Sequence, residues 1–115
     1  MLGVGTATAT ELEAEFRATG DLRCVFRTLM IAARDLSASD RLAPLREAVE
    51  VAELADDRRR RNLALTALAE AHAERDDRPS AFAALDRIAE TDGVGEAMAS
   101  CPLNLRDAYR PDFDA

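Results

Sequence analysis

His72 is the only histidine in the chain and the first residue to consider for chemistry, because an imidazole titrates near neutral pH. Without a second histidine, no histidine pair can hold a metal ion and no second imidazole base is available. His72 shares a helical stripe with Leu65 and Leu68. We therefore expect it to be a half-buried packing residue and not a catalyst.

Carboxylates at helical spacing are the next candidates for chemistry. Glu50 and Glu53 have the i, i+3 spacing at which one helix can offer two metal ligands, but no histidine joins them as in di-iron bundles. Glu11, Glu13 and Glu15 follow solvent-facing positions. No glycine-rich phosphate loop, Ser-His-Asp arrangement or Cys-x-x-Cys motif is present. The sequence predicts no enzyme, no metal ion and no cofactor.

A run of four positive charges stands out in a chain whose formal net charge is −7. Its members are Arg58, Arg59, Arg60 and Arg61. Cations at the start of a helix oppose the helix dipole, so we expect Asp56, Asp57 and Glu53 to compensate them. The alternative is that the run contacts an acidic partner or a phosphate group.

Charge and composition exclude several kinds of partner. All fifteen basic residues are arginine, a usage typical of a GC-rich bacterial genome, and the absence of lysine removes any Schiff-base nucleophile. The charge of −7 repels the phosphates of nucleic acids and anionic lipids. We therefore expect the partner to be another protein, and neither a nucleic acid nor a membrane.

The compartment follows from the N-terminus and the cysteines. The first residues lack a basic stretch followed by an apolar core, and no apolar run approaches the length of a membrane span, so we expect a cytoplasmic protein. Cys24 and Cys101 are far apart in the sequence and form no close-spaced pair, which predicts two reduced thiols. Whether these two cysteines ever pair stays open.

Helices must position all of these residues. The chain holds 24 alanines and few β-branched runs, which favours an all-α fold with closely packed helices. We expect a flexible segment over 1–9, one α-helical domain over 10–100 and an irregular acidic tail over 101–115, with Tyr109 and Phe113 as candidates to anchor it. The domain should contain five or six antiparallel helices. Their expected ranges are 10–19, 22–36, 41–55, 58–74, 79–90 and 95–100.

Three details of this pattern can be checked. The apolar stripe of 22–36 is broad, which predicts the central and most buried helix. Pro44 is expected in the first turn of its helix, where proline is tolerated. The stripe through Val49 would arrive at the charged Asp56, so we expect a break at 56–58, although a single helix over 41–75 is the alternative.

The segment 65–92 resembles a tetratricopeptide repeat, a helix-turn-helix unit of many interaction scaffolds. The residues that match the pattern are Leu65, Leu68, Ala69, His72, Ala81 and Leu85. Ile88 and Gly93 depart from it, because the family prefers alanine and proline there. An earlier segment fits similarly through Leu12, Phe16, Gly20, Asp21, Leu29 and Ala32, with Val25 in place of the characteristic alanine. The two units are 56 residues apart, so an extra helix separates them.

The resemblance implies that a partner docks on the surface formed by the first helix of each hairpin. That surface would present Thr10, Ala14, Arg17, Thr66, Glu70 and Ala73. Arg17 is the residue there suited to a partner carboxylate. We therefore expect a protein–protein interaction domain, with the arginine run as a further contact and a homo-oligomer as one possible assembly. The alternative is a small acidic inhibitor of phage or plasmid origin that imitates nucleic acid.

Overall fold

The computed structural model describes residues 22–109 and shows an all-α fold in that range. The predicted all-α class is therefore confirmed. The helix expected to start near Thr10 lies outside the described residues, together with Arg17 and Phe113. The helices are α2 (Leu22–Arg34), α3 (Ala38–Leu54), α4 (Arg58–Glu74), α5 (Arg78–Asp92) and α6 (Val94–Ser100), followed by a 3-10 turn at Leu103–Leu105.

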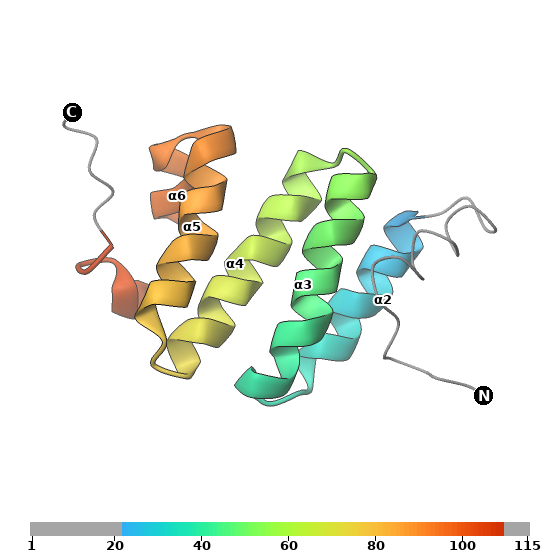
Figure 1. Cartoon of the computed structure of the whole chain (residues 1–115), viewed down its shortest axis with the longest axis horizontal. Coiled ribbons are helices and arrows are strands. Elements are labelled where there is room, and N and C mark those ends of the chain that lie inside the picture. The colour runs from blue at the N-terminus through green and yellow to red at the C-terminus, as the bar shows by residue number, and fades with distance from the viewer. Residues whose placement is uncertain (1–21, 110–115) are drawn as a thin grey trace.

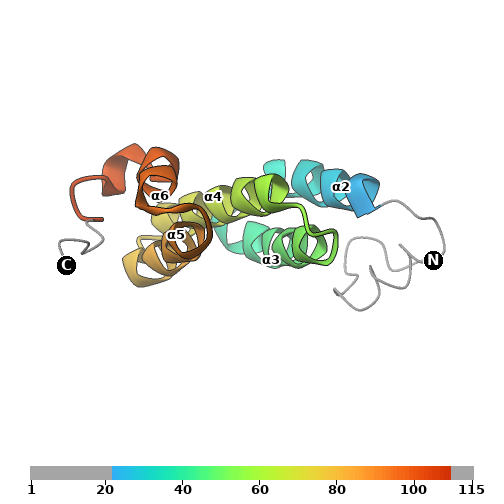
Figure 2. The ribbon, with the colours of Figure 1, turned by 90° about the horizontal axis from the view of Figure 1, so that it is seen from above.

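Each helix runs antiparallel to the next, and together they form a row from α2 to α6 (Figure 1). Seen from above, the row is a zigzag in which α2 and α4 lie in one layer and α3 and α5 in the other (Figure 2). Because α3 is antiparallel to both of its neighbours, α2 and α4 run in the same direction. The single helix between them, α3, therefore places α2 and α4 in the same layer (Figure 2).

Small side chains let these helices pack closely. Ala48, Ala64 and Ala81 are fully buried between neighbouring helices, and Leu65 and Leu85 fill the space around them. Burying such leucines stabilises the fold by about 2 kcal/mol each. The core is continuous from α2 to the residues after α6, so the described helices form one packed stack.

The prediction that 22–36 forms the central helix is wrong within the described part of the chain. Only one face of α2 is buried, at Leu22, Phe26, Leu29 and Ala33. Ile31 is 49% exposed, and Ala32 is exposed too. α3, α4 and α5 are the described helices that each pack between two others (Figure 1). Among residues 22–109, α2 is therefore the first helix of the row, with apolar side chains such as Ile31 exposed.

The start of α3 also differs from the prediction. Ser37 caps the helix, since its hydroxyl accepts the backbone N–H of Asp40 at 3.2 Å. The helix thus begins at Ala38, and Pro44 lies inside it instead of in its first turn. Because proline has no N–H, the carbonyl of Asp40 lacks its usual helical bond at this point.

Two identical turns separate α3 from α4 and α4 from α5. Asp56 and Asp76 adopt left-handed φ angles of 54° and 59°. The next residues, Asp57 and Asp77, close the turns by donating their N–H groups to the carbonyls of Ala52 and His72, each at 2.9 Å. The predicted break at 56–58 is confirmed, and the alternative of one helix over 41–75 is wrong.

The chain after α6 packs back onto the stack. Cys101, Leu105 and Tyr109 are buried. The ring of Tyr109 lies against Phe82 of α5, with centroids 5.5 Å apart, and its hydroxyl donates to Asp86 Oδ1 at 3.0 Å. The part of the expected tail that the structure describes is therefore folded against α5.

Candidate functional site: a basic and apolar groove between α2 and α4

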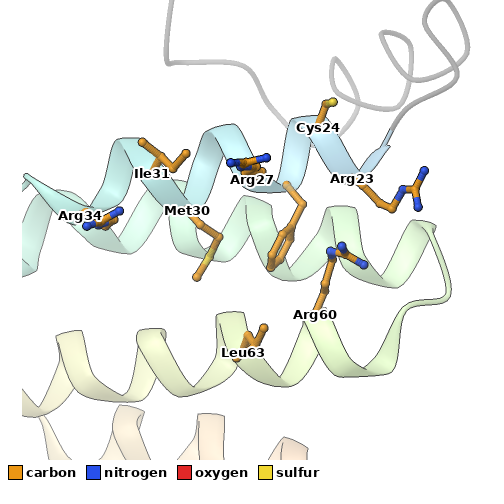
Figure 3. Close-up of a pocket in the computed structure, with 9 residues that line it drawn as sticks. Arg23, Cys24, Arg27, Met30, Ile31, Arg34, Arg60 and Leu63 are labelled. Atoms are coloured by element: carbon orange, nitrogen blue, oxygen red, sulfur yellow. The ribbon is translucent and has the colours of Figure 1, made fainter.

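A groove of about 650 Å³ lies between α2 and the first half of α4 (Figure 3). It is lined by Arg23, Cys24, Phe26, Arg27, Met30, Ile31, Arg34, Arg60 and Leu63. Seven of these residues come from α2 and two from α4. The groove exists because the zigzag places these two helices side by side in one layer (Figure 2).

The apolar part of the groove has a buried floor and exposed edges. Phe26 is only 6% exposed and belongs to the core, and Met30 packs against that core. Ile31 and Leu63 are 49% and 54% exposed. Met30 and Leu63 both project toward the space between the two helices (Figure 3). Large apolar side chains left open in this way mark a surface that another apolar group can cover.

The charged part of the groove is entirely basic. α2 carries Arg23, Arg27 and Arg34 and contains no Asp or Glu. None of the three makes a hydrogen bond or salt bridge with residues 22–109. Arg60, on the α4 side, is held by Asp57 Oδ2 at 2.5 Å. α2 thus carries three arginines without an ion-pair partner among residues 22–109, in a chain of net charge −7.

Sequence reasoning missed this site, although it carried a signal. The arginines of α2 stand in a helix without one acidic residue, which is unusual in an acidic chain. We had expected α2 to be buried on most sides, and a buried helix offers no docking surface. Leu63 lies near α2 because of the order in which the helices pack. The apolar periodicity of the two helices does not reveal that order.

The arginine run at the start of α4 is mostly compensated inside the protein. Arg58 Nη1 contacts Asp92 Oδ1 at 3.0 Å, and Arg61 Nε contacts Glu53 Oε2 at 3.0 Å. With Asp57 on Arg60, the expected roles of Asp57 and Glu53 are confirmed. Asp92, which is 34 residues from Arg58, was not predicted. Its carboxylate has the compensating role that we predicted for Asp56.

Arg59 differs from its three neighbours. It is exposed and makes no hydrogen bond or salt bridge with the described part of the chain. Arg61 is the most enclosed, because it also donates to Thr91 Oγ1 at 3.1 Å, and Glu53 in turn accepts Arg87 Nη2 at 2.8 Å. The run is therefore part of an ion-pair network across α3, α4 and α5. Arg59 is its member without an ion-pair partner among residues 22–109.

The other predicted site residues lie on α4. Thr66 is half-buried, and its hydroxyl donates to the Asn62 carbonyl at 2.8 Å, so it is engaged within its own helix. Glu70 is exposed and follows Leu63 by two helical turns, which places it on the same face of α4. Neither residue lines the groove. Arg17, with Thr10 and Ala14 of the expected surface, lies outside the described residues.

A buried polar pair joins the start of α4 to the end of α5. Asn62 is 9% exposed, and its side-chain Nδ2 donates to Asp92 Oδ2. This hydrogen bond, with a smaller effect from Arg58, holds the pKa of Asp92 below its usual value. The amide oxygen of Asn62 has no hydrogen-bond partner among the described residues. The pair links the ends of the two helices, and neither residue lines the groove between α2 and α4.

His72 is more buried than predicted, at 5% exposure. Burial lowers the pKa of its imidazole, and the nearby Asp77 only partly opposes that effect. Among the described residues no group of three His, Cys, Asp or Glu side chains lies close enough to hold a metal ion. His72 is therefore a neutral core side chain at neutral pH, since burial favours the uncharged form.

The cysteines occupy opposite ends of the stack. Cys24 lies on α2 and is exposed, while Cys101 follows α6 and is buried. Burial raises the pKa of the Cys101 thiol, which lowers its reactivity. The distance between α2 and α6 prevents a disulfide between them within one chain (Figure 1).

No protein-family model, curated protein or solved structure matches the chain. Within residues 22–109 no helix is long and apolar enough to cross a membrane. The groove between α2 and α4 therefore has to be interpreted from its own chemistry.

Proposed function

We propose that the protein is a non-enzymatic interaction domain that binds another protein in the groove between α2 and α4. The observation that carries this proposal is the combination, on one surface, of exposed apolar edges with arginines that have no ion-pair partner within 22–109. Apolar contacts supply binding energy, and arginines are enriched at protein interfaces because they pair with carboxylates in a defined geometry. The resemblance of 65–92 to a tetratricopeptide unit, which is an interaction module, supports the same proposal.

This proposal changes the expected docking surface. The surface inferred from the resemblance used Thr66 and Glu70 of α4, and the groove uses Arg60 and Leu63 of the same helix. Thr66 is bonded within α4, and neither Thr66 nor Glu70 lines the groove. Glu70 is exposed on α4, and its role in binding stays a prediction.

Site-specific photo-crosslinking tests the proposal. A benzoylphenylalanine at Leu63 places the reactive group at the groove, and the same residue at Leu103, which is 81% exposed at the far end, is the matched control. In a lysate of the source cells, we expect a discrete adduct with another protein from Leu63 and none of that size from Leu103. Equal adducts from both positions would mean that the groove is not the binding surface.

The salt response of the captured complex separates this function from an acidic decoy. A nucleic-acid mimic binds through its negative surface and loses affinity steeply as salt rises. A groove with an apolar floor retains most of its affinity under the same change. The decoy function would be favoured if the Leu63 adduct disappeared at moderate salt and also disappeared when surface carboxylates were substituted.

A further inference from the structure

Resting on the proposed function, we infer that the groove's ligand is an acidic amphipathic helix of another protein. Such a helix presents apolar side chains along one stripe and carboxylates beside that stripe. The inference follows from the spacing of the groove's charges, its apolar floor and its shape.

The arginines of α2 form a ladder along the groove. Arg27 follows Arg23 by four residues, and Arg34 follows Arg27 by seven. In a helix these spacings correspond to rises of about 6 and 10 Å. Carboxylates with the same spacing on a second helix would face them in register, and each arginine can form two parallel hydrogen bonds to a carboxylate.

The apolar floor favours a peptide over a phosphate ligand. Phosphates would satisfy the arginines but would leave Met30, Ile31 and Leu63 in contact with water. Methionine adapts its shape to different apolar partners, which suits a peptide-binding surface. The net charge of −7 also repels the extended negative charge of a nucleic acid.

The shape of the groove fits a helix. α2 and α4 run in the same direction within one layer (Figures 1 and 2), and the groove's lining on α2 extends from Arg23 to Arg34. The thirteen residues of α2 give it a length of about 20 Å, which accommodates three to four turns of a ligand helix. Laying an amphipathic helix into an apolar groove is a common mode of peptide recognition.

Synthetic probes test this inference on the full chain by fluorescence anisotropy. The first probe is a helix of about four turns with leucines on one stripe and glutamates at spacings of four and seven. The second has glutamine for each glutamate, and the third has serine for each leucine. A DNA duplex of similar length is the fourth. We expect the first probe to bind at least about tenfold more tightly than each of the others.

A pair of matched charge reversals locates the binding. Arg27→Glu alters the middle of the ladder, and Arg78→Glu makes the same change at an exposed position on α5. Arg27→Glu should weaken the first probe at least about tenfold, whereas Arg78→Glu should leave it unchanged. Both side chains lie outside the core, and a thermal melt of each variant checks that it folds.

Several results would overturn the inference. Equal binding of the serine probe would mean that charge alone is recognised, and tighter binding of DNA would point to phosphate. Self-association in sedimentation that Arg27→Glu abolishes would make a second copy of this chain the occupant. If the probes fail while Leu63 still crosslinks a partner, the ligand class is wrong and the proposed function stands.

Discussion

Nδ1 of His72 lies 3.8 Å from Oδ2 of Asp77, beyond hydrogen-bond distance, and has no other partner in the described part of the chain. The Asp77 carboxylate is engaged elsewhere, because it accepts the backbone N–H of Ser80 at 3.2 Å and caps α5. Hydrogen bonds from the side chain and the backbone N–H of Ser80 hold the pKa of Asp77 below its usual value. Burial lowers the pKa of the His72 imidazole, and the nearby Asp77 carboxylate, which favours the protonated form, has the smaller effect.

We expect stability to fall as the pH drops from about 7 toward 5. The pKa of His72 is lower in the folded chain than its ordinary value of 6.5. The unfolded chain therefore takes up the proton first, and the stability present above that value is lost as the pH falls toward the folded pKa, at up to about 1.4 kcal/mol per unit. Urea unfolding at several pH values measures this slope.

His72→Phe is the variant that isolates the histidine. It retains a ring of similar size and removes the titrating group along with the unpaired Nδ1. The pH slope between 7 and 5 should flatten in this variant. The aspartates with lowered pKa values do not affect this slope. The stability that they add is present above the ordinary carboxyl pKa and is lost only below about pH 4. An unchanged slope would mean that another group is responsible.

Much of the fold could be predicted from the sequence because its helix boundaries are local. Asp77 and Gly93 mark the start and end of α5, and the charged stretch at Asp56 marks the break before α4. These signals act within a few residues of the chain. The order in which the helices pack is not a local property, so the place of α2 at the end of the described row had to come from the structure.

The candidate site was predictable only in part for the same reason. The partners of Arg60 and Arg61 are close in sequence and were expected. The partner of Arg58, Asp92, is 34 residues away and depends on where α5 ends. The groove requires knowing that the zigzag brings Leu63 beside α2. Periodicity shows which face of a helix is apolar but not which helix lies against it.

The paired aspartates of the turns give the next prediction. Asp57 caps α4 by accepting the N–H of Arg60 at 3.0 Å, so Asp57→Ala should cost about 1 kcal/mol of stability. Asp56 has a left-handed backbone, which glycine adopts without strain. Asp56→Gly should therefore be neutral or stabilising. Chemical unfolding of the two neighbouring variants tests this, and a larger loss for Asp56→Gly would contradict the assigned turn.

Tyr109 anchors the residues after α6, and its two contacts can be separated. Tyr109→Phe keeps the ring against Phe82 and removes the hydrogen bond to Asp86, which should cost about 1 kcal/mol. Tyr109→Ala removes both and should cost about 3 kcal/mol. Equilibrium unfolding in urea gives the two values. Equal losses would mean that the ring contact contributes nothing.

The same tyrosine predicts sensitivity to alkali. Burial, with the hydrogen bond to Asp86, raises the pKa of Tyr109 well above its ordinary value of 10. The unfolded chain therefore loses this proton first, and stability falls as the pH rises above about 10. Tyr109→Phe should remove that part of the alkaline loss. A thermal melt at pH 9 and above, compared with the parent chain, shows whether it does.

Asn62 and Asp92 should behave as a unit, because each satisfies the other across the ends of α4 and α5. Asp92→Ala leaves the buried amide of Asn62 without its acceptor, so the midpoint of urea unfolding should fall. Asn62→Leu alone removes the unpaired amide oxygen but leaves Asp92 with Arg58 as its remaining partner. The double variant removes both polar groups from the contact between α4 and α5, and we expect it to be more stable than Asp92→Ala. That result would show that the two residues are coupled, since independent losses would add and make the double variant the least stable of the three.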